Sequence, residues 1–445
     1  MKIVIAGIGS IGYHLAELLS IEGHDVILID SSKEVLRHTS NHLDVMTILG
    51  DATSIETLQK INLRNTELFI AVTTSEQSNL LVCMLAKKFG APKTIARILN
   101  PEYFKEKIRK NFEELGVDTL ISPSLLAANE IQKMLRKASF SEVFEFEKGK
   151  IAVVGFTVDN MSPIVNKTVQ EINQQHIEYT IRYVAIIRGD ETLIPRGSTI
   201  VRKGDHLFVA SLNTDLQLVR RLVGKHIKPI KKVMVLGDSY LAFTVAELIE
   251  EEYKTKVVVC DKTVADRFAS HLKKALVLQA NPDDIDVLKE EGLAQMDAFI
   301  ALTGNYETNI ITSLMAENVG VYKTIASVDN LNYSQIQFNI GIDSIINRKR
   351  IAANNIFKFI RKGVIKDFKG LPGTEIEIIE FELNNKKITD IPIFNLKLPK
   401  ECIIIGVIRS GRAYIPDGDF CLRSKDKVVI SALPNVIHII EDMFR

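Results

Sequence analysis

Three glycines near the start of the chain have the spacing of a phosphate-binding turn. Gly7, Gly9 and Gly12 form the pattern G-x-G-x-x-G directly after the apolar run IVIA of residues 3–6, and an apolar, helix-like stretch follows. In such a turn the first glycine makes the tight bend, the second lets the backbone approach a pyrophosphate, and the third lets the helix pack close to the strand. The free N–H groups and the dipole at the start of that helix favour an anion. The pattern therefore predicts a nucleotide-binding site.

An aspartate follows at the position that contacts the ribose in such sites. A second strand-like run, DVILI at residues 25–29, ends in Asp30, 18 residues after Gly12. Its carboxylate could accept hydrogen bonds from both ribose hydroxyls of an adenosine. Ser31 and Ser32 come next instead of an arginine, which favours a free 2′-hydroxyl, as in NAD or ATP, over NADP.

The elements that must position these residues alternate between strand-like and helix-like. Short apolar runs at residues 45–53, 68–75 and 93–98 alternate with amphipathic stretches. This order indicates an α/β fold, a doubly wound, Rossmann-like domain with a parallel sheet. Ligands of such sheets bind beyond the carboxyl ends of the strands. Five polar residues fall at such ends and could line one cleft: Asp30, Asp51, Thr73, Thr74 and Arg97.

The composition indicates a large protein without a membrane-spanning segment. Of the 445 residues 46% are hydrophobic, enough to fill the cores of about three or four domains. A formal net charge of +1 argues against a nucleic-acid binder. The longest uncharged stretch, residues 3–16, is too short to span a bilayer and leaves no room before it for a targeting peptide. The 4 cysteines lack C-x-x-C spacing, so we expect a cytosolic protein without a disulfide or a metal site.

The chain contains two copies of one pair of domains. A small α+β module, with strand-like runs at residues 181–187 and 206–210, follows the first nucleotide domain, and KKVMVLGDSYL at residues 231–241 then repeats the opening of the chain. Gly7 matches Gly237 at an offset of 230, and we pair Asp30 with Asp261 after one inserted residue. The small module recurs at an offset of 221. We expect four domains: residues 1–137, 138–225, 230–362 and 368–445.

The second copy lacks several residues that the nucleotide site needs. Gly9 becomes Ser239, which adds a Cβ where a pyrophosphate must approach, and Arg97 becomes Ser327, which cannot contact phosphate with two N–H groups. Gly12 and Asp51 are also replaced, by Ala242 and Asn281. We therefore expect the second pocket to bind weakly or not at all.

The order of these motifs resembles a known family. The glycine turn, GDAT at residues 50–53, AVTTSEQSN at residues 71–79 and ARI at residues 96–98 resemble the RCK (KTN) domain, and the small module with IIRG, IPRG and KGD resembles its RCK_C companion. The tandem duplication over essentially the whole chain is similar to the TrkA family, cytosolic regulatory subunits of bacterial Trk potassium-uptake systems.

This resemblance implies roles for individual residues. Gly7, Gly9, Ser10, Ile11 and Gly12 would hold the phosphates of NAD(H), or of ADP or ATP, and Asp30 would bind the ribose. Three more residues, Asp51, Ala52 and Thr53, would border the adenine. Thr73 and Thr74 would line the floor of the pocket, and Arg97 would reach phosphate. In the second copy only Gly237 and Asp261 are retained.

The resemblance also implies partners. It points to a homo-oligomer, a tetramer, docked on the inner face of the cell membrane against a TrkH/TrkG-type potassium transporter, with no enzyme activity and no nucleic acid. A basic stretch at residues 348–350 is interpreted as a solvated helix flank, with a membrane-facing surface as the alternative.

Two other functions remain open at this stage. An NAD-dependent oxidoreductase would need a His, Lys or Tyr positioned beside the nicotinamide. A scaffold that has lost ligand binding is the third possibility. The sequence does not distinguish NADH from ATP as the ligand, since both present a phosphate and a ribose diol.

Overall fold

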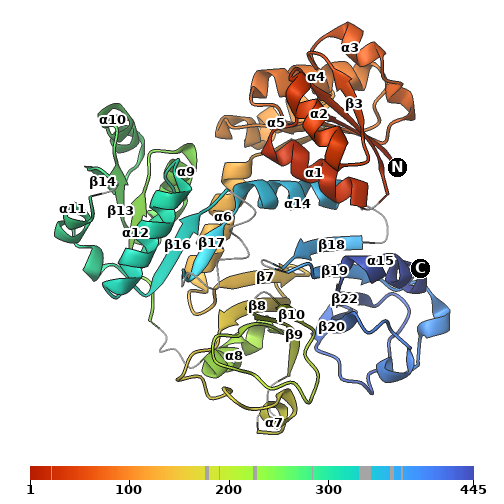
Figure 1. Cartoon of the computed structure of the whole chain (residues 1–445), viewed down its shortest axis with the longest axis vertical. Coiled ribbons are helices and arrows are strands. Elements are labelled where there is room, and N and C mark those ends of the chain that lie inside the picture. The colour runs from red at the N-terminus through yellow and green to blue at the C-terminus, as the bar shows by residue number, and fades with distance from the viewer. Residues whose placement is uncertain are drawn as a thin grey trace. The chain divides into compact units, whose positions relative to one another are not determined.

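The computed structural model describes residues 1–21, 23–175, 180–189, 191–223, 228–282, 284–329, 342–360, 365–371 and 374–444. The chain forms two compact units, shown with the element labels in Figure 1. The first contains Met1–Ala127 and Asn347–Ile360, and the second contains Ala128–Ile346 and Arg361–Arg445. Two of the expected domain boundaries, at residues 225 and 362, lie outside the described residues.

The first unit is built on a parallel sheet of six strands, which we call the first N domain. The strand order is β3-β2-β1-β4-β5-β6, so the direction of winding reverses between β1 and β4, where ligands of such sheets bind. All strand pairs are parallel, which confirms the predicted α/β class. The strands are β1 (Lys2–Ala6), β2 (Asp25–Asp30), β3 (Met46–Leu49), β4 (Leu68–Ala71), β5 (Thr94–Arg97) and β6 (Thr119–Ile121).

The apolar runs of the sequence form the centre of this sheet. Residues 3–6 of β1 and residues 69–71 of β4 are 0% exposed, because helices cover both faces, as expected of strands without polar alternation. The helices are α1 (Ser10–Ile21), α2 (Lys33–His42), α3 (Ile55–Gln59), α4 (Glu76–Lys88) and α5 (Glu106–Glu114). A helix from much later in the chain, α14 (Arg348–Ile360), belongs to the same unit and packs against α1 (Figure 1).

The second unit contains the other three sheets and most of α6 (Pro123–Arg136). The first C domain is a five-stranded antiparallel sheet in the order β10-β9-β11-β8-β7. Its elements are β7 (Glu142–Phe146), β8 (Ile151–Thr157), α7 (Val169–Gln175), β9 (Ile181–Arg188), β10 (Glu191–Leu193), β11 (His206–Leu212) and α8 (Leu216–Val223).

The second N domain repeats the first, with the strand order β14-β13-β12-β15-β16-β17. Its strands are β12 (Lys232–Leu236), β13 (Lys254–Val259), β14 (Leu276–Gln279), β15 (Ala298–Ala301), β16 (Lys323–Ser327) and β17 (Ser344–Ile346). Its helices include α9 (Tyr240–Ile249), α10 (Lys262–His271), α11 (Ile285–Glu290) and α12 (Tyr306–Asn318).

The second C domain has the sheet order β18-β19-β22-β20-β21. It contains β18 (Ile365–Gly370), β19 (Glu377–Glu382), β20 (Cys402–Arg409), β21 (Arg412–Tyr414), β22 (Lys427–Ala432) and α15 (Pro434–Phe444). One ion pair is common to both C domains: Arg188 binds the buried Asp205 at 2.8 Å, and Arg409 binds the buried Asp426 at 2.7 Å. The two pairs are 221 residues apart, as the sequence repeat predicts.

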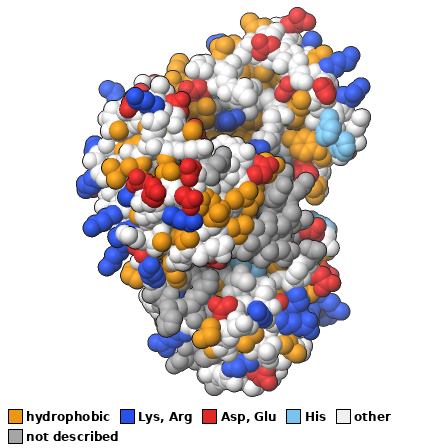
Figure 2. Space-filling view, turned by 60° about the vertical axis from the view of Figure 1, so that its left-hand side comes forward, with side chains coloured by type: hydrophobic (Ala, Val, Ile, Leu, Met, Phe, Trp, Pro, Cys, Tyr) orange, Lys and Arg blue, Asp and Glu red, His pale blue; other side chains and the backbone are white. Residues whose placement is uncertain are grey.

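The surface gives no sign of one dominant basic field. On the face drawn in Figure 2, Lys and Arg side chains are interspersed with acidic and apolar ones, in agreement with the net charge of +1. Within the described part of the chain, no helix combines the length and the apolar character that crossing a membrane requires.

Candidate nucleotide-binding site

The glycine turn joins β1 to α1 at the point where the strand order reverses. Gly7 has φ +95°, and a Cβ there would lie 2.7 Å from the backbone nitrogen of Thr73. A Cβ at Gly12 would lie 2.0 Å from the carbonyl oxygen of Gly7. A Cβ at Gly9 would meet no atom within 4 Å, and its φ lies outside the left-handed region. The protein's own packing therefore requires two of these glycines, whereas the third faces open space, as a group that approaches a ligand should.

The first turn of α1 has no side-chain cap, unlike the helices beside it. The residue before α2, Ser32, accepts a hydrogen bond from the Val35 N–H at 3.4 Å, and Ser75 caps α4 by accepting from the Ser78 N–H at 3.1 Å. Gly9 occupies the corresponding position before α1 and has no side chain. Among the described residues, no side chain accepts from the N–H groups of residues 10–12. These groups remain available for a phosphate, and the helix dipole favours one there.

Asp30 fastens the glycine turn to the end of β2. Its Oδ2 accepts from the Ile8 N–H at 2.7 Å, and its Oδ1 accepts from the Ser32 N–H at 2.9 Å. Each carboxylate oxygen has a second lone pair and can still accept a ribose hydroxyl. The sequence indicated the ribose role alone, and the structure adds that Asp30 shapes the turn.

A buried asparagine that the sequence analysis left without a role organises the other side of the cleft. The Asn79 Oδ1 accepts from the Thr73 N–H at 2.9 Å and from the Thr73 hydroxyl at 2.7 Å, and its Nδ2 donates to the Arg97 carbonyl at 2.9 Å. The second N domain has the same arrangement of Thr303 and Asn309. Because it persists where other site residues are lost, its function is to join the ends of neighbouring strands. The hydroxyl of Thr73 is already used within the protein.

Arg97 brings an uncompensated positive charge to the carboxyl end of β5. Its Nε is buried without a hydrogen-bond partner, and its nearest acceptor is the Thr73 carbonyl, 3.4 Å from Nη1. No carboxylate in the described part of the chain forms an ion pair with it. Burial lowers the pKa of Arg97, and the positive charge of Arg348, on the first turn of α14, lowers it further. An anionic ligand would relieve both effects. The sequence interpretation of residues 348–350 as a solvated flank missed the nearness of Arg348.

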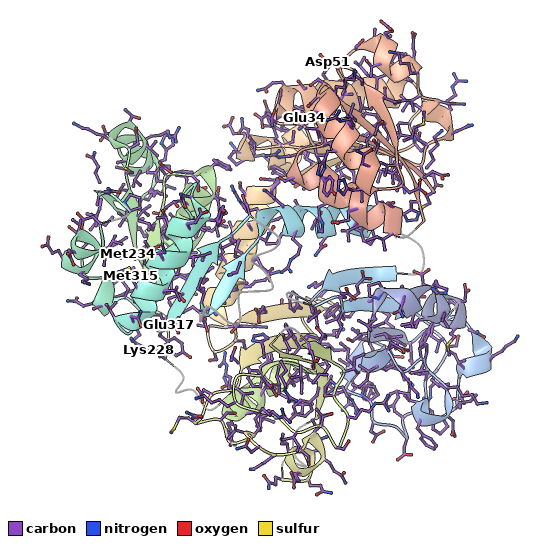
Figure 3. All side chains as sticks on the ribbon, viewed as in Figure 1. Glu34, Asp51, Lys228, Met234, Met315 and Glu317 are labelled. Atoms are coloured by element: carbon purple, nitrogen blue, oxygen red, sulfur yellow. The ribbon has the colours of Figure 1, made fainter. Side chains whose placement is uncertain are left out.

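The GDAT segment closes the far side of the site. The Gly50 N–H donates to the Asp30 carbonyl at 3.0 Å, and Asp51 then forms a tight turn in which its Oδ1 accepts from the N–H and the hydroxyl of Thr53, each at 2.8 Å. These bonds lower the pKa of the Asp51 carboxyl. Asp51 is exposed beyond β3, as Figure 3 shows, whereas Ala52 is buried. Thr74 is exposed in the loop after β4.

In the second N domain the helix is capped by the protein itself. Ser239, in the place of Gly9, accepts from the Ala242 N–H at 3.2 Å and donates to the Leu302 carbonyl at 2.8 Å. Its hydroxyl therefore satisfies the N–H groups that a phosphate would use. Gly237 keeps the turn itself, with φ +133° and a Cβ position only 2.6 Å from the Leu302 backbone.

The expected pairing of Asp30 with Asp261 is wrong. Gly7 donates to the Ile29 carbonyl, and Gly237 donates to the Val258 carbonyl, so Asp30 corresponds to Val259. Asp261 instead corresponds to Ser32, because each is the residue before the following helix. It caps α10 by accepting from the Val264 N–H at 2.9 Å. Hydrogen bonds from the Thr263 hydroxyl and from Val264 lower the pKa of the Asp261 carboxyl. The second N domain thus has no carboxylate at the ribose position.

Comparisons with known proteins match both repeats. The TrkA-N domain matches residues 3–123 and 233–348, and the TrkA-C domain matches residues 153–224 and 378–445. The chain is 30% identical to the Trk system potassium uptake protein TrkA homolog 1 of Methanosarcina mazei over 100% of both chains. It is 28% identical to the Trk system potassium uptake protein TrkA of Haemophilus influenzae, over 97% of this chain and 95% of that one.

Solved structures share the fold at low identity. The GsuK channel bound to NAD has a TM-score of 0.60 and 13% identity, covering 100% of this chain and 78% of that chain. GsuK bound to ADP has a TM-score of 0.52 and 10% identity, covering 81% of this chain and 69% of that chain.

Proposed function

The chain belongs to the TrkA family, and we propose that it is a nucleotide-binding regulatory subunit that controls a membrane potassium-uptake transporter. The observation that carries this proposal is the contrast between the two N domains. The first combines an uncapped helix at Gly9, an uncompensated Arg97 and a carboxylate at Asp30. The second has a capped helix, Ser327 and Val259 at the same places.

The proposed site holds one nucleotide per chain. Residues 10–12 and Arg97 bind the phosphates, and Asp30 accepts the ribose hydroxyls. Gly7 and Gly9 give the backbone its close approach, and the segment Asp51, Ala52 and Thr53 borders the base. Thr73 contributes its backbone to the floor beside Thr74. NAD(H) and ADP or ATP both fit this set, because each offers a pyrophosphate or phosphate chain and a ribose diol, and GsuK structures have been solved with NAD and with ADP.

We propose that binding changes the transporter without chemical turnover. A nucleotide can regulate only if it binds one state of the assembly better than the other, and a tenfold preference per site is worth about 1.4 kcal/mol. In a tetramer, four occupied and independent sites would supply roughly 5.5 kcal/mol, enough to move an equilibrium from 1:99 to 99:1. The partner would be a TrkH/TrkG-type transporter, which the subunit meets at the cytoplasmic face of the membrane.

Binding stoichiometry tests the proposal. Mass spectrometry identifies what co-purifies with the protein, and isothermal titration calorimetry with NADH, NAD, ATP and ADP then measures affinity and site number. We expect one site per chain. Two equal sites would contradict the assigned difference between the repeats, and no binding by any of the four would refute the proposed function. Steady NADH oxidation with carbonyl substrates would favour an oxidoreductase instead.

A further inference from the structure

A fully buried lysine joins the second N domain to the start of the first C domain. Lys323, the first residue of β16, is 0% exposed. Its Nζ donates to the Phe140 carbonyl and to the Ser344 hydroxyl, each at 2.8 Å, and lies 2.5 Å from the Asp343 carboxylate. Three acceptors thus serve the three N–H bonds of the ammonium group. A charge at this depth requires such full compensation, and losing its partners would be costly.

The residues that it holds are shared between two domains. The ring of Phe140 is buried in the core of the first C domain, while its carbonyl accepts from Lys323. The Ser141 N–H donates to the Gly155 carbonyl of β8 at 2.8 Å, while its own carbonyl accepts from the Ser344 hydroxyl at 2.6 Å. Two consecutive peptide groups are therefore fixed on one side by the first C domain and on the other by the second N domain. We call these five residues, Phe140, Ser141, Lys323, Asp343 and Ser344, the Lys323 junction.

Helix α6 leads from the first N domain to this junction. It begins two residues after β6, and β6 is tied to the residue after Arg97 because the Ile98 N–H donates to the Ile121 carbonyl at 2.8 Å. The last part of α6 binds the second N domain: the Gln132 amide and the Arg136 guanidinium both contact Glu252. A change at the end of β5 therefore has a continuous covalent route through α6 to residues 140 and 141.

The first N domain has a natural comparison for Lys323. Lys93 occupies the same place at the offset of 230, but its side chain is exposed. Asp118, which matches Asp343 by the register of the last strand, binds Lys87 at 2.9 Å instead. The buried lysine thus belongs to the repeat whose helix α9 is self-capped.

We propose that the second N domain, in place of nucleotide sensing, supports the transmission of the signal. Its Lys323 junction holds the start of the first C domain, so that nucleotide binding in the first N domain reaches the first C domain through α6. Lys323 and Ser344 are positioning residues in this scheme. The transmission part rests on the proposed function, whereas the holding of residues 140 and 141 does not.

Hydrogen exchange of the full-length protein, followed by mass spectrometry with and without NADH or ADP, tests this inference. Lys323→Met keeps the length of the side chain and removes its charge and its hydrogen bonds, and Lys93→Met is the matched control. Without nucleotide, we expect Lys323→Met to raise exchange in peptides covering residues 137–146 by about tenfold or more, and Lys93→Met to leave it unchanged. With nucleotide, the wild type should change its exchange in the first N domain and in residues 128–146, and Lys323→Met only in the first N domain.

The outcomes separate the inference from the proposed function. Wild-type exchange of residues 137–146 in Lys323→Met without nucleotide, or a preserved remote response with nucleotide, would overturn the inference. If Lys323→Met does not fold, Ser344→Ala replaces it, because this change removes the bond to Ser141 and leaves Lys323 paired with Phe140 and Asp343. It should raise exchange in the same peptides to a smaller extent, and unchanged exchange would overturn the inference. A wild type that binds no nucleotide refutes the proposed function and the transmission step with it, while the nucleotide-free comparison still decides whether the junction holds the segment.

Discussion

Replacing Gly9 by serine should abolish nucleotide binding without harming the fold. The Cβ of the new residue would meet no protein atom within 4 Å, and the backbone there has a φ that an L residue can adopt. The new hydroxyl can cap α1 as Ser239 caps α9, with the Val72 carbonyl in the place of that of Leu302. A compatible Gly→Xaa change together with a serine cap should raise the free energy of unfolding by about 0.5 to 1 kcal/mol.

The same hydroxyl competes with the phosphate. Loss of one charge-assisted hydrogen bond costs about 1.5 to 3 kcal/mol, which corresponds to a roughly tenfold to hundredfold weaker affinity. Calorimetric titration with NADH and ADP measures the affinity, and thermal unfolding measures the stability. Ser239→Gly is the reverse change in the second repeat, and we expect it to lower stability by a few tenths of a kcal/mol and to leave affinity unchanged. If Gly9→Ser binds nucleotide within twofold of the wild type, the assignment of the α1 N-terminus is refuted.

Three further substitutions distinguish ligand contacts from structural ones. Asp30→Ala should weaken nucleotide binding roughly tenfold to hundredfold in calorimetry and also lower the melting temperature, because the turn loses two hydrogen bonds of its own. Asp261→Ala should cost about 0.5 to 2 kcal/mol in denaturant unfolding as a lost helix cap, without any change in affinity; equal weakening of binding by these two changes would contradict the ranking. Arg97→Met should weaken ATP binding more than NADH binding and leave the nucleotide-free protein as stable or more stable, because the guanidinium is half-buried without an acid partner; a marked fall in melting temperature would contradict this.

The sequence predicted most of the fold because the fold is written in local patterns. Short apolar runs without alternation define buried parallel strands, and both six-stranded sheets were found where these runs repeat. The importance of Gly9 was also visible, since its replacement by Ser239 in the second copy changes one residue at a defined position of the turn. Asn79 left a detectable signal as well: it recurs as Asn309 although the residues around the site diverge.

Two features could not be read from residue counting. The pairing of Asp30 with Asp261 failed because the strand register differs by one residue: Lys2 pairs with Asp25 in the first sheet, whereas Lys232 pairs with Lys254 in the second. Serine and aspartate are both favoured caps, so Ser32 and Asp261 exchange easily at a helix start. The second feature is the position of Arg348, which depends on the packing of α14 against α1, far away in the sequence. Local patterns carry no information about such long-range packing.

Potassium uptake measured in cells that contain the partner transporter tests the central claim most directly. The comparison includes the wild-type chain, its deletion, and Gly9→Ser, which should remain folded and lose nucleotide binding. We expect the deletion to change the rate of uptake. Gly9→Ser should keep the protein at its normal level and lose the response of uptake to the cellular nucleotide. Equal uptake in all three strains would contradict the account of this chain as a nucleotide-dependent regulator.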